Sequence, residues 1–164
     1  MRKSISPLLL IILATVALAS DDKTDRATLH GIKAVCTIVE ITGPGQEGVT
    51  ITKDQLQAEV DGRLAAAGIP QDKDSTACVY LNMRPLPAMG KGNKPAGLYA
   101  LEMSIQVLQT VAVTRDPTIK TYAPTWSFSN LATVPTEDLR HTTRQMTIDL
   151  TDRFVDAYRA ANPK

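Results

Sequence analysis

The sequence has few residues whose type and spacing suit catalysis or metal binding. Its two histidines, His30 and His141, have no ligand at metal-binding spacing, so zinc catalysis and a histidine-based triad have little support. A G-x-S-x-G elbow, a Walker loop and a dinucleotide fingerprint are also missing from the sequence. We therefore predict that the protein is not an enzyme and that it has no catalytic, cofactor-binding or metal-binding residue.

One basic group has the chemistry to bind an anion. Lys91 and Lys94 lie in the glycine-rich segment "GKGNK", not far from Arg84 in the chain. These cations could together grip a phosphate or a carboxylated polymer, and Glu40 or Glu102 would complete a small-ligand or enzymatic site. The alternative is a solvated loop without a ligand. A concave pocket where the groups converge would favour the anion site, and a flat surface would exclude it.

The two cysteines, Cys36 and Cys78, could pair in an oxidising compartment. Strand alternation places Cys36 on the side of Ile38, which we expect to face inward, and Cys78 on the side of Tyr80, which we expect to face outward. Cysteines on opposite faces of a sheet cannot meet without distorting it. The phase argues against a disulfide, and the sequence leaves the pairing open because a one-residue slip reverses such an assignment.

The N-terminal segment indicates export. Arg2 and Lys3 precede an apolar run that is too short to span a bilayer comfortably, and Ala17 and Ala19 are small residues of the kind that signal peptidase accepts. We predict a signal peptide over 1–19, with an N-terminal membrane anchor as the alternative. The mature protein would then have no membrane span, and it would be located in the periplasm or be secreted.

Charge and composition bear on the class of partner. Loss of the leader removes two of the 18 basic residues, which then nearly balance the 17 acidic ones, so no net attraction to nucleic acid or anionic lipid follows. Aromatic residues make up 4% of the chain, which argues against a carbohydrate-binding platform of stacked rings. After the leader we expect a disordered lead-in over 20–28 and a single domain over 29–164.

The pattern of the domain predicts elements in the order β-α-β-β-β-α. Thr52 and Gln55 form a capping box at the start of the first helix, Gly68 follows its end, and Pro124 argues for an edge position of the last strand. We predict an α+β fold, a two-layer sandwich in which a four-stranded mixed sheet carries both helices on one face. The expected elements are strands over 29–41, 76–84, 98–114 and 119–132, helices from Thr52 and Thr136, a flexible loop over 85–97 and a turn over 115–118.

Gln109 interrupts the apolar side of the strand "ALEMSIQVLQTVAV" (100–113). We interpret it as the edge of the core, where the last helix ends, with its amide bonded to the final helical carbonyls or to the Tyr158 hydroxyl. A β-bulge is the competing explanation, but Val111 and Val113 keep the earlier phase, which favours the edge.

The edge interpretation leaves apolar residues beyond the helix. Val111, Val113 and Ile119 would lie on the tip of a hairpin over 108–120, where partly covered apolar surface is a candidate site for a protein partner. The alternative is that the first helix or the glycine-rich loop folds over this surface.

Four segments resemble a group of secreted bacterial proteins of unknown function, and the resemblance covers nearly the whole mature chain. It implies no activity, because none is assigned to that group. The element order is also similar to the N-terminal α/β domain of the periplasmic translocation protein TolB and to related domains of envelope-assembly lipoproteins, although this sequence lacks a propeller and a lipidated cysteine. The four segments are "ITKDQLQAEVDGRLAAAGI", "YALEMSIQVLQTVAV", "TWS" and "DRFVDAYRAANPK".

From these observations we expect an exported, non-catalytic binding or assembly module of the bacterial cell envelope. It would engage a protein partner through a sheet edge or through the hairpin tip. The alternative is a small-ligand or anion-binding protein, or an enzyme, that uses the basic loop near Arg84, Lys91 and Lys94.

Overall fold

The computed structural model describes residues 21–163, so the predicted signal peptide over 1–19 lies outside the described residues. None of the helices in the described part has both the length and the apolar character needed to cross a bilayer. In chain order the elements are α1 (Lys23–Ala27), β1 (Cys36–Ile41), η1 (Gln46–Gly48), α2 (Lys53–Ala66), β2 (Ala77–Met89), β3 (Pro95–Val113), β4 (Asp116–Pro135), η2 (Thr136–Asp138) and α3 (Leu139–Ala161).

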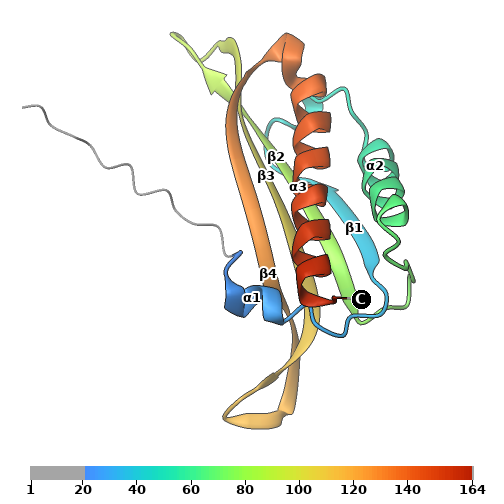
Figure 1. Cartoon of the computed structure of the whole chain (residues 1–164). Helices are drawn as coiled ribbons and strands as arrows, with labels where there is room; N and C mark the ends of the chain where they lie inside the picture. The colour runs from blue at the N-terminus through green and yellow to red at the C-terminus, as the bar shows by residue number, and fades with distance from the viewer. Residues whose placement is uncertain (1–20, 164) are drawn as a thin grey trace, which may run out of the picture.

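The four strands form one mixed sheet in the order β1-β2-β3-β4. β1 runs parallel to β2, while β2, β3 and β4 are joined as antiparallel neighbours. Figure 1 shows α2 and α3 on the same face of this sheet. The predicted α+β sandwich with a four-stranded mixed sheet is confirmed, and β4 lies at the edge that Pro124 indicates.

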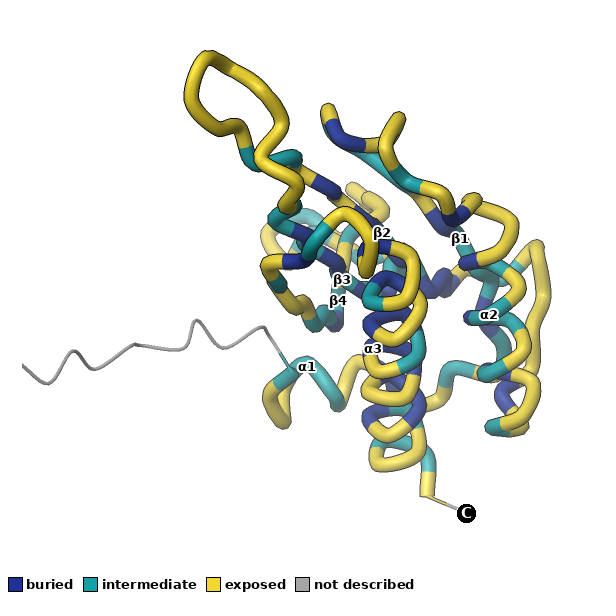
Figure 2. The backbone as a smooth tube through the Cα atoms, turned by 90° about the horizontal axis from the view of Figure 1, so that it is seen from above, coloured by how far each residue is buried: buried dark blue, intermediate teal, exposed yellow. Residues whose placement is uncertain are grey.

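The core lies between the sheet and the two long helices, and Figure 2 marks buried residues along α3, α2 and the strands. β3 alternates as predicted, and its inward side chains from Leu101 to Val107 are fully buried. Trp126 on β4 packs against Phe154 on α3, with ring centroids 5.7 Å apart. The fully buried side chains that fill the layer include Leu101, Met103, Ile105 and Val107 from β3, Leu56, Val60 and Leu64 from α2, and Leu150 and Phe154 from α3.

The helix starts differ in how far they match the sequence. The capping box of α2 is confirmed, because the Thr52 hydroxyl accepts from the Gln55 N–H while the Gln55 side chain accepts from the Thr52 N–H. Thr136 does not cap the last helix. It begins the short helix η2, and α3 starts at Leu139 without a side-chain cap bond.

The expectation of a flexible loop over 85–97 is wrong, because β2 and β3 continue into this segment and leave a short turn. Pro85 and Pro87 fit within β2 because β1 no longer runs beside it there. The Pro85 carbonyl points away from β3 and accepts from the Gly45 N–H at 3.1 Å. A proline at such a position removes no hydrogen bond from the β2–β3 ladder.

Cys36 and Cys78 form a disulfide, so the phase argument against their pairing is wrong. They are register partners on β1 and β2, with their Cα atoms 4.4 Å apart. The phase of β2 is as expected, but β1 begins only at Cys36, and Val39 rather than Ile38 is fully buried. The alternation followed from residue 29 therefore included residues that are not in the strand, and it assigned Cys36 to the wrong face.

Residues 21–28 are not the disordered lead-in that composition predicts. Lys23–Ala27 form α1, which lies against α3 and β4 (Figure 1). The segment that follows α1 bonds the end of α3: the His30 ring Nδ1 lies 2.8 Å from the Ala161 carbonyl, and the Asn162 amide donates to the Leu29 carbonyl at 3.0 Å. These specific hydrogen bonds order a segment whose composition alone gives no reason for order.

Candidate functional site

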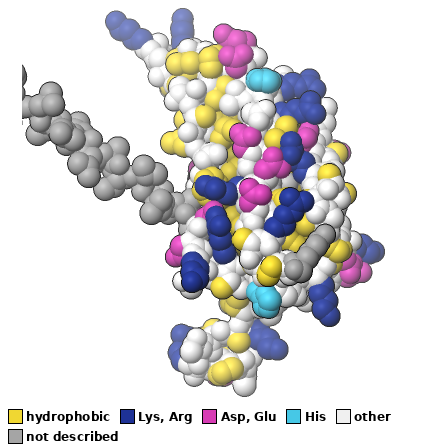
Figure 3. Space-filling view, in the orientation of Figure 1, with side chains coloured by type: hydrophobic (Ala, Val, Ile, Leu, Met, Phe, Trp, Pro, Cys, Tyr) yellow, Lys and Arg dark blue, Asp and Glu magenta, His cyan; other side chains and the backbone are white. Residues whose placement is uncertain are grey.

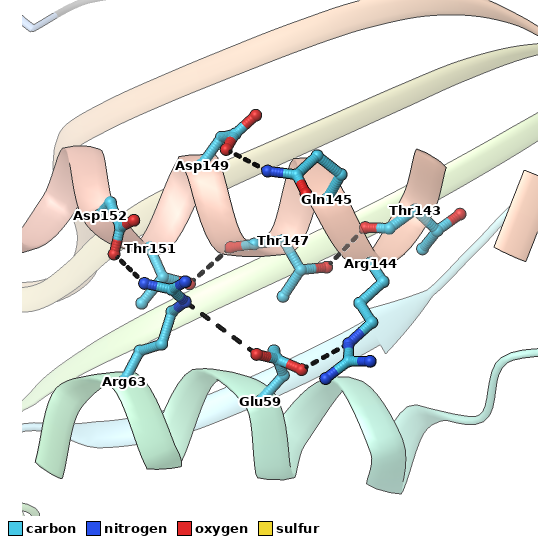
Figure 4. Close-up of polar contacts among 9 residues, drawn as sticks. All are labelled: Glu59, Arg63, Thr143, Arg144, Gln145, Thr147, Asp149, Thr151 and Asp152. Carbon is cyan, nitrogen blue, oxygen red and sulfur yellow. Dashed lines mark hydrogen bonds and ion pairs between the residues drawn. The ribbon is translucent and has the colours of Figure 1, made fainter. Parts of the chain in front are cut away.

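A group of charged side chains lies between α2 and α3 (Figure 4). Glu59 accepts from Arg144 Nε at 2.9 Å, and Arg63 donates from a terminal nitrogen to Asp152 at 2.6 Å. A shallow cavity of about 450 Å³ opens beside these residues, with Arg140 on its rim. Two of its three arginines are thus committed to carboxylates that join the helices.

Three threonines on α3 are fully buried along the same helix pair. The hydroxyl of Thr147 donates to the Thr143 carbonyl at 2.9 Å, and that of Thr151 donates to the Thr147 carbonyl at 2.7 Å (Figure 4). The hydroxyls of Thr147 and Thr151 are thus satisfied within α3, whereas the buried Thr143 hydroxyl has no hydrogen-bond partner among the described residues. The paired charges hold α2 on α3, and the paired carboxylates and the two bonded hydroxyls are not free to act as a base or a nucleophile.

The residues predicted for an anion site do not converge. Arg84 lies on β2 opposite Glu102 of β3, with 3.9 Å between Arg84 Nη1 and a Glu102 carboxylate oxygen. Lys91 and Lys94 lie in the turn beyond Met89, which is five strand residues further along β2, or about 17 Å at the rise of a strand. The structure therefore gives no support to the anion site.

Glu40 also has a local partner. It lies on β1, and the Tyr80 hydroxyl of β2 donates to its carboxylate at 2.7 Å. Burial, the hydrogen bond to Glu40 and the negative charge of Glu40 raise the pKa of Tyr80 to about 12. Tyr80 therefore stays protonated at neutral pH and links β1 to β2 on the face opposite the helices.

The predicted hairpin tip is a two-stranded ribbon that projects beyond the helices (Figure 1). Val111 and Val113 are half-buried, Ile119 is 48% exposed and Tyr122 is 47% exposed. Neither α2 nor the β2–β3 turn covers the ribbon. Helix α2 packs beside α3 and β1, and the turn lies at the opposite end of the molecule. Figure 3 shows the ribbon as a separate lobe on which hydrophobic and basic side chains lie side by side.

Gln109 marks the edge of the core, but its partners differ from the expected ones. Its amide donates to the Thr28 carbonyl at 3.1 Å and to the Thr125 hydroxyl at 2.6 Å. The Tyr158 hydroxyl instead donates to the Ile32 carbonyl. Gln109 therefore bonds the segment after α1, and that segment in turn bonds the end of α3.

β3 has no bulge at Gln109, as its phase indicates, but the neighbouring strand β4 has one opposite this position. Val107 pairs with Trp126 and Leu108 pairs with Pro124, so Thr125 is an extra residue in β4. The phase of β3 does not reveal an insertion in β4, so the sequence pattern gave no indication of this bulge. Gln109 and the bulge are parts of one feature, because the Thr125 hydroxyl is the closest partner of the Gln109 amide.

Sequence reasoning missed a cluster around Asp21. Its carboxylate, 6% exposed, accepts from Arg26 and from Trp126 Nε1 at 2.7 and 2.8 Å and lies 3.4 Å from Arg153 Nε. Burial is the largest single influence on the pKa of Asp21, and it raises this pKa. The hydrogen bonds from Arg26 and Trp126 and the charges of Arg26 and Arg153 together outweigh burial, so the pKa of Asp21 is lowered overall. Asp21 thus anchors α1 to the core.

Sequence reasoning also left the outer edge of β4 undescribed. Ser129, Asn130, Leu131 and Thr133 are exposed, and Leu131 is 74% exposed, the highest fraction among the large hydrophobic side chains of the described residues. The signal was available in the sequence, since "WSFSNLATV" (126–134) has neither a charge nor a proline, the residues that usually protect an edge strand.

These features define a small two-layer α+β domain with a disulfide across two strands. Among residues 21–163, no three His, Cys, Asp or Glu side chains are grouped in a way that could hold a metal ion. No family model and no curated protein matches the sequence.

Two solved structures of bacterial lipoproteins are similar to it. A minor lipoprotein from Acinetobacter baumannii is 15% identical, with a TM-score of 0.42 over 80% of this chain and 93% of that one. Rare lipoprotein B from Shewanella oneidensis is 11% identical, with a TM-score of 0.36 over 76% of this chain and 94% of that one. At these values the likeness transfers no function, and the expected similarity to TolB stays a prediction.

Proposed function

We propose that the protein is an exported, non-catalytic binding module of the bacterial cell envelope that engages a protein partner through the β3–β4 ribbon. Export is supported by the leader sequence over 1–19 and by the Cys36–Cys78 disulfide, because disulfides persist in oxidising compartments such as the periplasm. The charged clusters of the described residues support a non-catalytic role, since their groups are engaged in structural bonds.

The observation that carries the partner site is the exposure of the ribbon. A two-stranded ribbon without a covering layer is only marginally stable in water, and Ile119 and Tyr122 are about half exposed on it. Tyr122 pairs with Thr110 and Val111 pairs with Thr121, so Tyr122 lies on the face opposite Val111, and the proposed surface is the face of Val111. Exposed apolar side chains on an uncovered face of this kind mark interaction surfaces. A partner that covers Ile119 and the neighbouring Val111 and Val113 would remove this apolar surface from water.

Site-specific photo-crosslinking in the native envelope tests the proposal. A photoreactive residue at position 119 should give a discrete adduct with a partner protein, while the same residue at position 91, exposed at the opposite end of the molecule, should give none. With the probe moved to position 121, which is exposed and pairs with Val111, Ile119→Asp should lower the adduct yield without changing the melting temperature, because Ile119 lies outside the core. No adduct at 119, or equal adducts at 119 and 91, would contradict the proposal.

A further inference from the structure

The direction of the backbone groups in β4 follows from the ladder of the sheet. The Met83 carbonyl of β2 accepts from the Thr42 N–H on the β1 side, so Met83 and its partner Met103 form a non-hydrogen-bonded pair. The backbone N–H and C=O groups of Met103 therefore point to β4, where Met103 pairs with Asn130. The neighbours of Asn130 on β4, Ser129 and Leu131, direct their N–H and C=O groups away from the sheet.

This outward row of groups has defined ends. At one end the Thr125 carbonyl is occupied by the Thr28 hydroxyl at 3.1 Å, and at the other Pro135 has no N–H to offer. Between them the outward groups of Ser127, Ser129, Leu131 and Thr133 have no hydrogen-bond partner among the described residues. The edge is open over one short segment, and it is protected on both sides of that segment.

We propose that this segment pairs with the same segment of a second copy, antiparallel and centred on Asn130. This register places Ser127 opposite Thr133 of the second copy and Ser129 opposite Leu131. Every outward N–H and C=O of the segment then finds a partner, and the two sheets join into one. The two copies are related by a two-fold axis, the commonest symmetry of homodimers.

The side chains of the segment suit pairing with themselves. The segment 126–134 contains no charged residue, so no like charges meet across the interface. Small hydroxyl side chains face one another at Ser127 and Thr133, and the two Asn130 carboxamides lie directly opposite at the axis. A carboxamide both donates and accepts, so the two Asn130 side chains can bond each other reciprocally.

Cysteine substitution at the axis tests the register. In this arrangement the Cα atoms of the two residues at position 130 are about 4.5 Å apart, as in a non-hydrogen-bonded antiparallel pair, which is within the range of a disulfide. Asn130→Cys should therefore give a covalent dimer under oxidising conditions. Ser129→Cys is the matched control, exposed on the same edge but opposite position 131, and it should stay largely uncrosslinked. Equal crosslinking of the two variants would overturn the register.

A proline variant tests the backbone pairing itself. Ser129→Pro removes an outward N–H while leaving the β3–β4 ladder intact, so circular dichroism should show the same fold. Because each dimer loses this donor twice, the dissociation constant measured by analytical ultracentrifugation should rise about tenfold or more. Leu131→Ser keeps the backbone N–H and C=O groups, so it should change the dissociation constant less than Ser129→Pro does.

A wild-type protein that stays monomeric at the highest concentrations reached would overturn the proposal, and the edge would then be open to an extended segment of another protein. Crosslinking at position 119 is a separate observation, so failure of the dimer and failure of the ribbon site are distinguishable.

Discussion

At the residue scale, the Asp21 carboxylate makes the docking of α1 depend on pH. Its pKa is lowered in the folded protein, so its contribution to stability is present above the ordinary aspartate pKa and is lost as the pH falls through the lowered one. We expect acidification to release α1 from Trp126 and to change the fluorescence of this single tryptophan.

The Asp21→Asn variant should lack this acid transition, and its α1 should dock less tightly by about 1.5–3 kcal/mol, the range for hydrogen bonds to charged groups. Asp25→Asn is the matched control, because it removes a nearby carboxylate, within α1, that forms no ion pair among the described residues. An acid transition that is unchanged in Asp21→Asn would contradict this assignment.

Gln109 shows what a single residue reveals in the sequence and what it does not. Its position in an apolar row predicts a boundary of the core, and the structure places a boundary there. Its partners, Thr28 and Thr125, lie 81 and 16 residues away in the chain, on a segment and a bulge that the pattern of β3 does not reflect. The type and phase of a residue indicate its environment, whereas its partners depend on elements that approach from elsewhere.

At the element scale, the Cys36–Cys78 disulfide links the edge strand β1 to β2 across 42 residues of chain. Removing both sulfurs with Cys36→Ser and Cys78→Ser should lower the free energy of unfolding by about 3–4 kcal/mol, the chain-entropy contribution for a loop of this size. Urea unfolding followed by circular dichroism measures the change.

Reduction provides the control for that experiment. Dithiothreitol should lower the urea midpoint of the wild type toward that of the double variant, and it should leave the double variant unchanged. A wild type whose midpoint does not respond to reduction would show that the disulfide does not stabilise the fold.

The elements differ in how much of them can be predicted, and the reason is physical. The first turn of α2 is encoded by Thr52 and Gln55, which bond within that turn, so a local pattern was sufficient. The start of the strand β1 is determined by its pairing with β2, which no local pattern shows. An alternation counted from residue 29 therefore assigns Cys36 to the wrong face. Pro85 and Pro87 led to the wrong prediction of a loop, because whether β2 can contain a proline depends on where β1 ends.

At the scale of the whole molecule, the layer arrangement follows from the alternation of β3 and the caps of α2, and both were visible in the sequence. The candidate surfaces follow from what is left uncovered, which depends on the lengths of elements relative to one another. The ribbon is exposed because α3 ends at Ala161 while β3 and β4 continue, and Val111, Val113 and Ile119 were found by that comparison of lengths. The open outer edge of β4 could be identified only from the hydrogen-bond ladder of the sheet, which the sequence does not show.

The two ends of the described chain meet at one end of the domain. Asp21 and His30 line the same cavity as Ala160 and Ala161, and the Asn162 side chain accepts from the Gly31 N–H at 2.8 Å. A circularly permuted gene that joins residue 163 to residue 21 through a short flexible linker, and opens the chain in the turn at 92–93, should therefore encode the same fold. Its melting temperature should stay near that of the wild type, and its new termini would emerge at the pole farthest from the ribbon, leaving both candidate surfaces free of any fused tag.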